Sequence, residues 1–149
     1  MDGVEVTGAH PGDVGDLVAL LRGGALGPDH EVDDPAPYVA ALGEIEAAGG
    51  RVLVARASGR VVGVCQLLVF RHLQHAGGRC AEIESLHVAE DCRGHGVGGV
   101  LLEAAVAHAR QAGCYRVQLT SDERRSAAHR FYLAHGFVAS HRGFKRVLA

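Results

Sequence analysis

The sequence predicts an α/β fold: one domain spanning residues 1–149, in which helices flank a central mixed sheet. The length of 149 residues suits a single domain of ordinary size. Two strand-like segments joined by a tight turn predict an antiparallel hairpin in the first half. A strand–helix–strand order in the second half predicts a parallel crossover. Both kinds of pairing in one sheet make it mixed, and the helical segments are available to cover its faces.

The first half is expected to run strand, helix, helix, strand, strand. Pro11–Asp13 offers a turn with Asp13 as N-cap, and Gly23–Gly24 ends the helix that follows. Residues 24–36 are rich in Gly, Pro and Asp and are expected to form a loop. Ser58–Gly59 is the tight turn of the hairpin. The expected strands are residues 4–7, 51–56 and 60–70, and the expected helices are residues 14–22 and 37–48.

The second half is expected to continue strand, helix, strand, helix. Residues 80–88 and 115–120 are the parallel strands, because a helix over residues 96–112 connects them. A last helix over residues 126–135 ends at Gly136. Residues 137–148 are expected to add one or two final strands.

The composition narrows the classes of partner. A net charge of −2 argues against a nucleic-acid or membrane-surface partner, and no apolar run is long enough to span a membrane. The N-terminus lacks the pattern of a secretory signal. Four scattered cysteines without a Cys-x-x-Cys pair are typical of reduced thiols in a cytoplasmic protein. The His-rich segment 71–75 with Cys80 lacks a second zinc-spaced pair, so no metal is expected.

A glycine-rich turn is the most informative segment. Residues 86–99 read as the end of a strand, a short polar loop and glycines that open a helix. The first turn of a helix has free N–H groups and a partial positive charge, and glycine lets a phosphate approach the backbone closely. Arg93 adds a charged donor. The pattern predicts a site for a phosphate-bearing ligand.

Two phosphate ligands compete at this turn. Residues 94–99 match the dinucleotide pattern G-x-G-x-x-G, and Asp122 follows at about the distance of a ribose-binding acid. In that pattern, however, the first glycine closes directly on the strand, whereas residues 89–93 intervene here. The antiparallel strands also come first, which argues against a nucleotide-binding oxidoreductase.

The segment Arg93-Gly94-His95-Gly96-Val97-Gly98 resembles the [Arg/Gln]-x-x-Gly-x-[Gly/Ala] motif of the GNAT superfamily of acetyl-coenzyme A-dependent N-acetyltransferases. Residues 128–137 resemble the second motif of that superfamily, Ala-x-x-Phe-Tyr-x-x-x-Gly-Phe. The order and separation of the motifs match, and so does the order of the elements. The resemblance therefore covers nearly the whole chain. It implies acetyl-CoA as co-substrate and direct attack by an amine in a ternary complex. We hypothesise a small primary amine as the acceptor, while polyamines, amino acids, aminoglycosides, arylamines and protein N-termini all stay open.

The resemblance also implies the binding residues. Arg93, Gly94, His95, Gly96, Val97 and Gly98 would hold the pyrophosphate. Leu86 and Val88 would offer backbone groups to the pantetheine arm, with the Val88 N–H polarising the thioester carbonyl. Ser126 stands where the family often has Asn, and its hydroxyl has a shorter reach toward the pantetheine.

Acyl transfer to an amine requires a base and an acid. Tyr132 occupies the position of the family's general acid. Glu82 and Glu84 are both candidates for the base, since residues two apart share one face of a strand. Glu84 is preferred because it lies nearer the thioester end. His87 is placed on the opposite face, and it and His129 are expected to be structural.

An acid-rich loop is the signal in the sequence that bears on the acceptor. Asp29, Glu31, Asp33 and Asp34 in the first loop either attract a cationic amine or form an ordinary solvated loop. Glu84 and Tyr132 favour an enzyme over the alternative, a non-catalytic acyl-CoA-binding sensor, because a pure binder needs neither. Self-association into a homodimer stays open.

Overall fold

The computed structural model describes residues 3–148 and shows two compact units. The N-terminal unit comprises residues 1–118 and the C-terminal unit residues 119–149. The first contains almost the whole sheet, and the second contains one helix and the segment that follows it.

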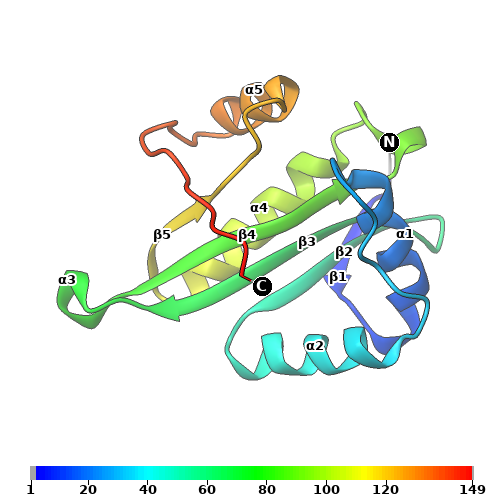
Figure 1. The fold of residues 1–149 in the computed structure, drawn as a ribbon, viewed down its shortest axis with the longest axis horizontal. Coiled ribbons are helices and arrows are strands. Elements are labelled where there is room, and N and C mark those ends of the chain that lie inside the picture. The colour runs from blue at the N-terminus through cyan, green and yellow to red at the C-terminus, as the bar shows by residue number, and fades with distance from the viewer. Residues whose placement is uncertain (1–2, 149) are drawn as a thin grey trace. The chain divides into compact units, whose positions relative to one another are not determined.

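Five strands form the sheet, and their order in space is their order in the sequence (Figure 1). Pairing is antiparallel from β1 to β4. β5 is the neighbour of β4, and the side-chain contacts between them advance together along both strands, from Cys80–Arg116 to Glu82–Gln118, as they do in a parallel pair. The mixed sheet is therefore confirmed. The strands are β1 (Glu5–Gly8), β2 (Arg51–Ala57), β3 (Arg60–Arg71), β4 (Arg79–Val88) and β5 (Cys114–Leu119).

The helices of the N-terminal unit lie close to their expected positions. They are α1 (Val14–Gly24), α2 (Ala36–Ala47), the one-turn α3 (Gln74–Gly77) and α4 (Val97–Gln111), with 3-10 turns η1 (Pro11–Asp13) and η2 (Glu90–Cys92). Sequence analysis expected only a loop where α3 lies. Its His75 and Ala76 are left-handed, so α3 is a tight turn between β3 and β4.

Helices α1 and α4 cover opposite faces of the sheet. Val64 of β3 packs in a buried cluster with Leu17 and Leu20 of α1. The next residue back, Gly63, faces Val97 and Leu101 of α4. Because successive residues of a strand point to opposite faces, the two helices lie on opposite sides of β3 (Figure 1). The buried core thus has two layers, one on each face.

A β-bulge in β4 changes the face of the sheet to which the last side chains of this strand point. Glu84 pairs with Gln66 and His87 with Val64, so two residues of β4 oppose the single Cys65. Ser85, inside the bulge, has a φ of 52°. Directly paired residues point to the same face, so Glu84 and His87 share one face of the sheet. The expectation that His87 lies on the opposite face was wrong, because the extra residue shifts the alternation by one.

Asp13 does not cap α1 as expected. Its backbone is already helical, and no side-chain cap bond forms. Its carboxylate instead accepts hydrogen bonds from the His10 N–H at 2.8 Å and from Arg56 at 2.7 Å. The short η1 turn brings this carboxylate over β2, where Arg56 lies. Asp13 is only 8% exposed, so the ion pair ties the start of α1 to the sheet.

The C-terminal unit contains α5 (Ser126–Ala134), which ends at the left-handed Gly136 as expected. Residues 137–148 form no strand, contrary to the expectation of one or two. A strand exists only through pairing, and the apolar side chains of this segment are exposed: Val138, Phe144, Val147 and Leu148. The sequence of this segment did not reveal whether a neighbouring strand would pair with it.

Removing the Asp13 charge is expected to destabilise the fold. Burial raises the pKa of Asp13, but Arg56 and the His10 N–H lower it further, so the pKa lies below its ordinary value. A carboxylate with a depressed pKa stabilises the fold above its unfolded pKa, and this contribution is lost as the pH falls through the folded pKa. Asp13→Asn should lower Tm by about 5 °C at pH 7, and the difference from the wild type should shrink below about pH 4.

Asp16→Asn is the matched control, because Asp16 is an exposed carboxylate in the first turn of the same helix. Thermal unfolding followed by circular dichroism measures both variants. Equal Tm values for the two variants would contradict the structural role of the Asp13–Arg56 pair.

Candidate active site

The turn between β4 and α4 forms an open, glycine-lined approach to a helix N-terminus. Gly94 and Gly96 have φ values of 75° and 83°, in the region that favours glycine. A Cβ at either position would meet nothing within 4 Å. Gly96 is the N-cap of α4 and offers no side-chain cap, so the first N–H groups of a 15-residue helix face outward beside it. This geometry allows a phosphate group to approach the helix N-terminus.

Close packing fixes this helix end to the sheet. A Cβ at Gly63 would lie 2.8 Å from Leu101 Cδ1 and 3.3 Å from Val97 Cγ1. Both side chains are buried, so only the backbone of Val97 is available to a ligand. Arg60 at the start of β3 binds Asp91 at 2.6 Å and the buried Cys92 Sγ at 3.2 Å. Contacts with β3 therefore hold the chain both before the turn, at Asp91 and Cys92, and after it, at Val97 and Leu101.

Arg93 lies exposed at the start of the turn. Its Nε donates to the Val88 carbonyl oxygen at 3.1 Å, which joins the turn to the end of β4. A guanidinium has five N–H donors, so this bond leaves others for an anion. The Arg93 carbonyl in turn contacts His95 Nδ1 at 2.9 Å. These contacts give the segment Arg93–Gly96 one defined shape.

The two candidate bases on β4 have different surroundings. Glu82 is partly buried, and its carboxylate accepts a hydrogen bond of 2.7 Å from the Gln118 amide, which bridges β4 and β5. Glu84 is exposed on the face that α1 covers, two residues nearer the glycine-rich turn. Glu82 thus joins the two strands, and Glu84 is the more exposed of the two carboxylates.

Tyr132 and Ser126 both lie on α5 of the C-terminal unit. Tyr132 is half-buried and makes edge contacts with Phe131 and Phe137, at ring-centroid distances of 5.3 and 5.9 Å. Ser126 is exposed in the first turn of the helix. His129 contacts the Asp122 carbonyl at 2.8 Å, which agrees with a structural role.

The Asp122 carboxylate is hydrogen-bonded to a residue of its own unit. Its carboxylate accepts hydrogen bonds from the backbone and guanidinium of Arg124, which hold its pKa well below the usual range. This arrangement removes the acid on which the dinucleotide interpretation depended.

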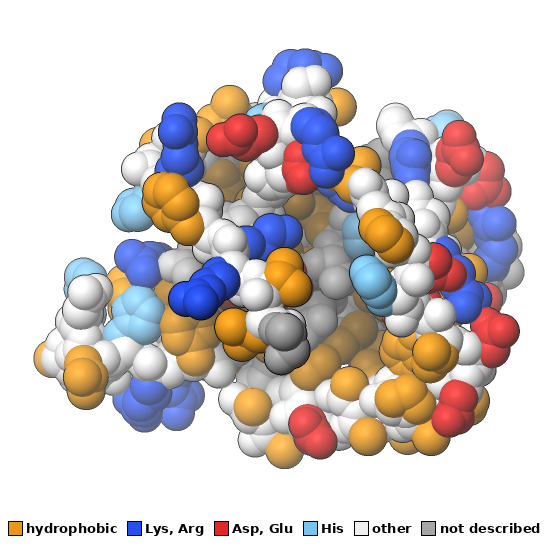
Figure 2. All heavy atoms as spheres, in the orientation of Figure 1, with side chains coloured by type: hydrophobic (Ala, Val, Ile, Leu, Met, Phe, Trp, Pro, Cys, Tyr) orange, Lys and Arg blue, Asp and Glu red, His pale blue; other side chains and the backbone are white. Residues whose placement is uncertain are grey.

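The acid-rich loop after α1 is an internal network. Arg22 binds Asp29 and Asp33, each at 2.9 Å, and donates to the Glu31 carbonyl oxygen. Glu31 accepts from the Tyr38 hydroxyl at 2.7 Å, and Asp34 accepts from the Ala36 N–H. Figure 2 shows acidic side chains interspersed with basic ones on the side where α1 lies in Figure 1. These contacts shape the loop and offset part of its negative charge.

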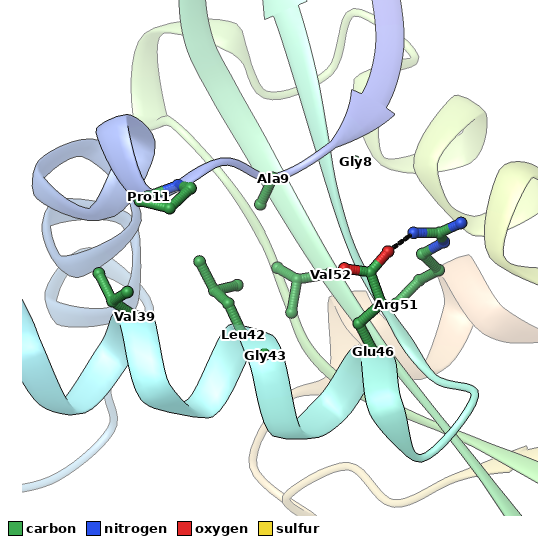
Figure 3. Close-up of a pocket in the computed structure, with 9 residues that line it drawn as sticks. All are labelled: Gly8, Ala9, Pro11, Val39, Leu42, Gly43, Glu46, Arg51 and Val52. Atoms are coloured by element: carbon green, nitrogen blue, oxygen red, sulfur yellow. Dashed lines mark hydrogen bonds and ion pairs between the residues drawn. The ribbon is translucent and has the colours of Figure 1, made fainter.

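A cavity and a buried thiol of the N-terminal unit lie apart from the predicted site residues. A cavity of about 190 Å³ lies between α2 and β2, with the Glu46–Arg51 ion pair at its edge (Figure 3). No predicted site residue lines it. Burial raises the pKa of the Cys65 thiol to about 12, which keeps it protonated. Among residues 3–148, no three His, Cys, Asp or Glu side chains are placed to hold a metal, and no helix could span a membrane.

Sequence analysis missed two features that shape the site. One is the bulge at Ser85, for which the sequence carries no glycine or proline as a signal. The other is the close approach of α4 to Gly63. A glycine inside a strand often marks such an approach, so this signal was present in the sequence.

Comparison with known proteins identifies the family. The model of the acetyltransferase (GNAT) family matches residues 22–137. An aminoalkylphosphonate N-acetyltransferase of Salmonella typhimurium is 41% identical over 91 residues, which are 61% of this chain and 58% of that protein. The chain thus aligns with little more than half the length of this relative.

Solved structures agree over the whole length. A Bacillus halodurans protein described as a transcriptional regulator is 33% identical, with a TM-score of 0.89 over 98% of this chain and 100% of that one. A Trypanosoma brucei acetyltransferase is 25% identical, with a TM-score of 0.82 over 98% and 100%. The glycine-rich turn, the mixed sheet and the family match agree, and the chain belongs to the GNAT family of acetyltransferases.

Proposed function

We propose that this acetyltransferase moves the acetyl group of acetyl-CoA to the primary amine of a small molecule by direct attack in a ternary complex, with residues 1–149 acting as one domain. The observation that carries the proposal is the open helix N-terminus at Gly94 and Gly96, anchored at the end of the strand that bears Glu84. One end of this strand thus offers a place for a pyrophosphate and for a base.

Separate groups of residues bind the pyrophosphate and the pantetheine arm of acetyl-CoA. The turn Arg93–Gly98 holds the pyrophosphate through backbone N–H groups and the Arg93 guanidinium. The backbone groups of Leu86 and Val88 pair with the pantetheine arm, and the Val88 N–H polarises the thioester carbonyl. Ser126 adds a hydroxyl contact to that arm.

The chemistry requires two proton movements. Glu84, directly or through one water, accepts a proton from the substrate ammonium, and the neutral nitrogen then attacks the thioester carbon. The carbon–sulfur bond breaks as the carbonyl re-forms. Tyr132 gives its proton to the leaving thiolate, at a cost of about 2 kcal/mol set by the ordinary pKa values of phenol and thiol. The nitrogen, which became positively charged on attack, then loses its second proton, and this proton restores the Tyr132 hydroxyl and leaves a neutral amide.

The acceptor class follows from the loop and from the Salmonella relative. The acids after α1 are bound to Arg22 and Tyr38, which weakens the case for steering a polycation. The name of the relative specifies an aminoalkylphosphonate. A short primary amine, with or without an anionic group at its far end, is therefore the class to test first. Aminoalkylphosphonates, neutral amines and diamines of equal length form the panel.

A second candidate function is a non-catalytic acyl-CoA sensor. The observation in its favour is the Bacillus halodurans relative described as a transcriptional regulator. A sensor would bind acetyl-CoA without releasing its thiol in the presence of any amine. The same panel, read by free-thiol release, separates the two candidates.

Gly96→Glu should abolish the binding of coenzyme A, because it places bulk and negative charge where the pyrophosphate must lie. Gly113→Glu is the matched control. Gly113 also has a positive φ and open space around its Cβ position, but it lies beyond the other end of α4. Isothermal titration calorimetry should show loss of binding in the first variant only. Equal affinity for coenzyme A in both variants would contradict the assignment of the pyrophosphate site to this turn.

Glu84→Gln keeps the shape of the side chain and removes the proton acceptor. The rate at neutral pH should fall by roughly 10²–10⁴-fold and recover as the pH approaches the amine pKa of about 10. Glu82→Gln is the control, because Glu82 is bound to Gln118. A pH–rate profile of each variant decides between them. Rescue at high pH in the Glu82 variant instead would make Glu82 the base.

Tyr132→Phe should lower kcat by roughly 10²–10⁴-fold and leave the affinity for acetyl-CoA within a few-fold, because only the phenolic hydroxyl is lost and the ring is kept. Phe131→Leu provides the control for packing on the same helix, since Phe131 contacts the Tyr132 ring. Steady-state kinetics and calorimetry measure the two effects separately. A Tyr132 variant with the wild-type rate would assign the ring to packing alone.

A further inference from the structure

The last residue of α1 is in close contact with the imidazole of His87. A Cβ atom built on Gly24 would overlap this ring, because it would lie only 2.7 Å from the Cγ atom of His87. The neighbouring Gly23 has nothing within 4 Å of the same position. Gly24 lies outside the left-handed region, so its backbone would accept any residue. A side chain at Gly24 would therefore force the ring of His87 to move.

The bulge in β4 brings this contact next to the candidate base. His87 and Glu84 pair with Val64 and Gln66, which are neighbours on one face of β3. Without the extra residue at Ser85, His87 would point toward α4 on the other face. The bulge thus places the imidazole on the face that α1 covers, at the next position along the strand from the carboxylate.

This placement limits the space beside Glu84. A base must come within about 3 Å of the ammonium, or within reach of one bridging water, so the amine has to stand on this face of β4. There it meets the His87 ring and, behind it, the end of α1. The loop that begins at Ala25 is held to the same helix turn by Arg22. The His87–Gly24 contact therefore fixes one wall of the space that an acceptor must enter.

We propose that the His87–Gly24 contact is the specificity-determining element of this acetyltransferase. It sets the distance between the end of α1 and β4, and it restricts the acceptor to primary amines that are unbranched next to the nitrogen. His87 acts here as a positioning residue through its bulk. This inference rests on the proposed amine acetyltransferase function.

Four variants test the contact. Gly24→Ala introduces the overlap, His87→Ala removes the ring, and the double variant removes the ring while keeping the added methyl group. Gly23→Ala is the matched control, because it makes the same change one residue earlier in the same helix and in open space. Each variant is assayed for kcat and KM with unbranched and α-branched primary amines of equal charge. Calorimetry gives the affinity for acetyl-CoA, and thermal unfolding verifies the fold.

Gly24→Ala should raise KM for the unbranched amine at least 10-fold, and the double variant should return it to within a few-fold of His87→Ala. The ratio of kcat/KM for branched over unbranched amines should rise at least 10-fold in His87→Ala. Affinity for acetyl-CoA should stay within about two-fold throughout, and Gly23→Ala should behave as the wild type. A merely structural contact would change Tm without changing the ratio of the two amines.

Two outcomes overturn the inference and are distinguishable. If the wild type acetylates amines and His87→Ala keeps its preference for unbranched ones, the His87–Gly24 contact does not set specificity. If the wild type binds acetyl-CoA but releases no thiol with any amine, the proposed function fails and this inference fails with it. Should Gly24→Ala not fold, the amine ratio of His87→Ala decides alone.

Discussion

The packing of α4 on Gly63 is the contact on which the site depends. Because residue 63 has no side chain, Val97 and Leu101 bury against the middle of the sheet, and the first turn of α4 comes to the end of β4. The open N–H groups of that turn then lie in the same unit, and at the same end of the strand, as the backbone of Val88. A larger residue at position 63 would move the helix away from the sheet, and the glycine-rich turn would lose its position beside the end of β4.

The bulge at Ser85 is the second constraint, and it acts on the opposite face. It turns His87 from the α4 side of the sheet to the α1 side without changing the pairing on either side of it. One strand therefore contributes to two surfaces. Its end is joined to the glycine-rich turn through the Arg93–Val88 hydrogen bond, and the face that α1 covers carries Glu84 and His87. A left-handed serine is strained, and such strain is common where a strand has to redirect a side chain.

Much of this organisation could be predicted from the sequence, and the failures have identifiable causes. Hydrophobic periodicity and glycine stops located the helices to within one or two residues, because these are local signals. The glycine-rich turn was recognisable because its function requires a specific backbone. The predicted orientation of His87 was wrong, because a bulge depends on how a strand pairs with its neighbour. No local sequence pattern encodes that pairing. The strands expected within residues 137–148 and the cap at Asp13 failed for the same reason: Asp13 binds Arg56, 43 residues away.

The central claim is that the anchored helix end and β4 together transfer acetyl groups to amines. The most direct measurement is the release of coenzyme A thiol from acetyl-CoA by the purified chain of residues 1–149, in the presence of each amine of the panel, with mass spectrometry of the product. The account predicts thiol release in equal amount to an N-acetylated short primary amine. Saturable acetyl-CoA binding without thiol release or acetylated product for any amine would contradict it.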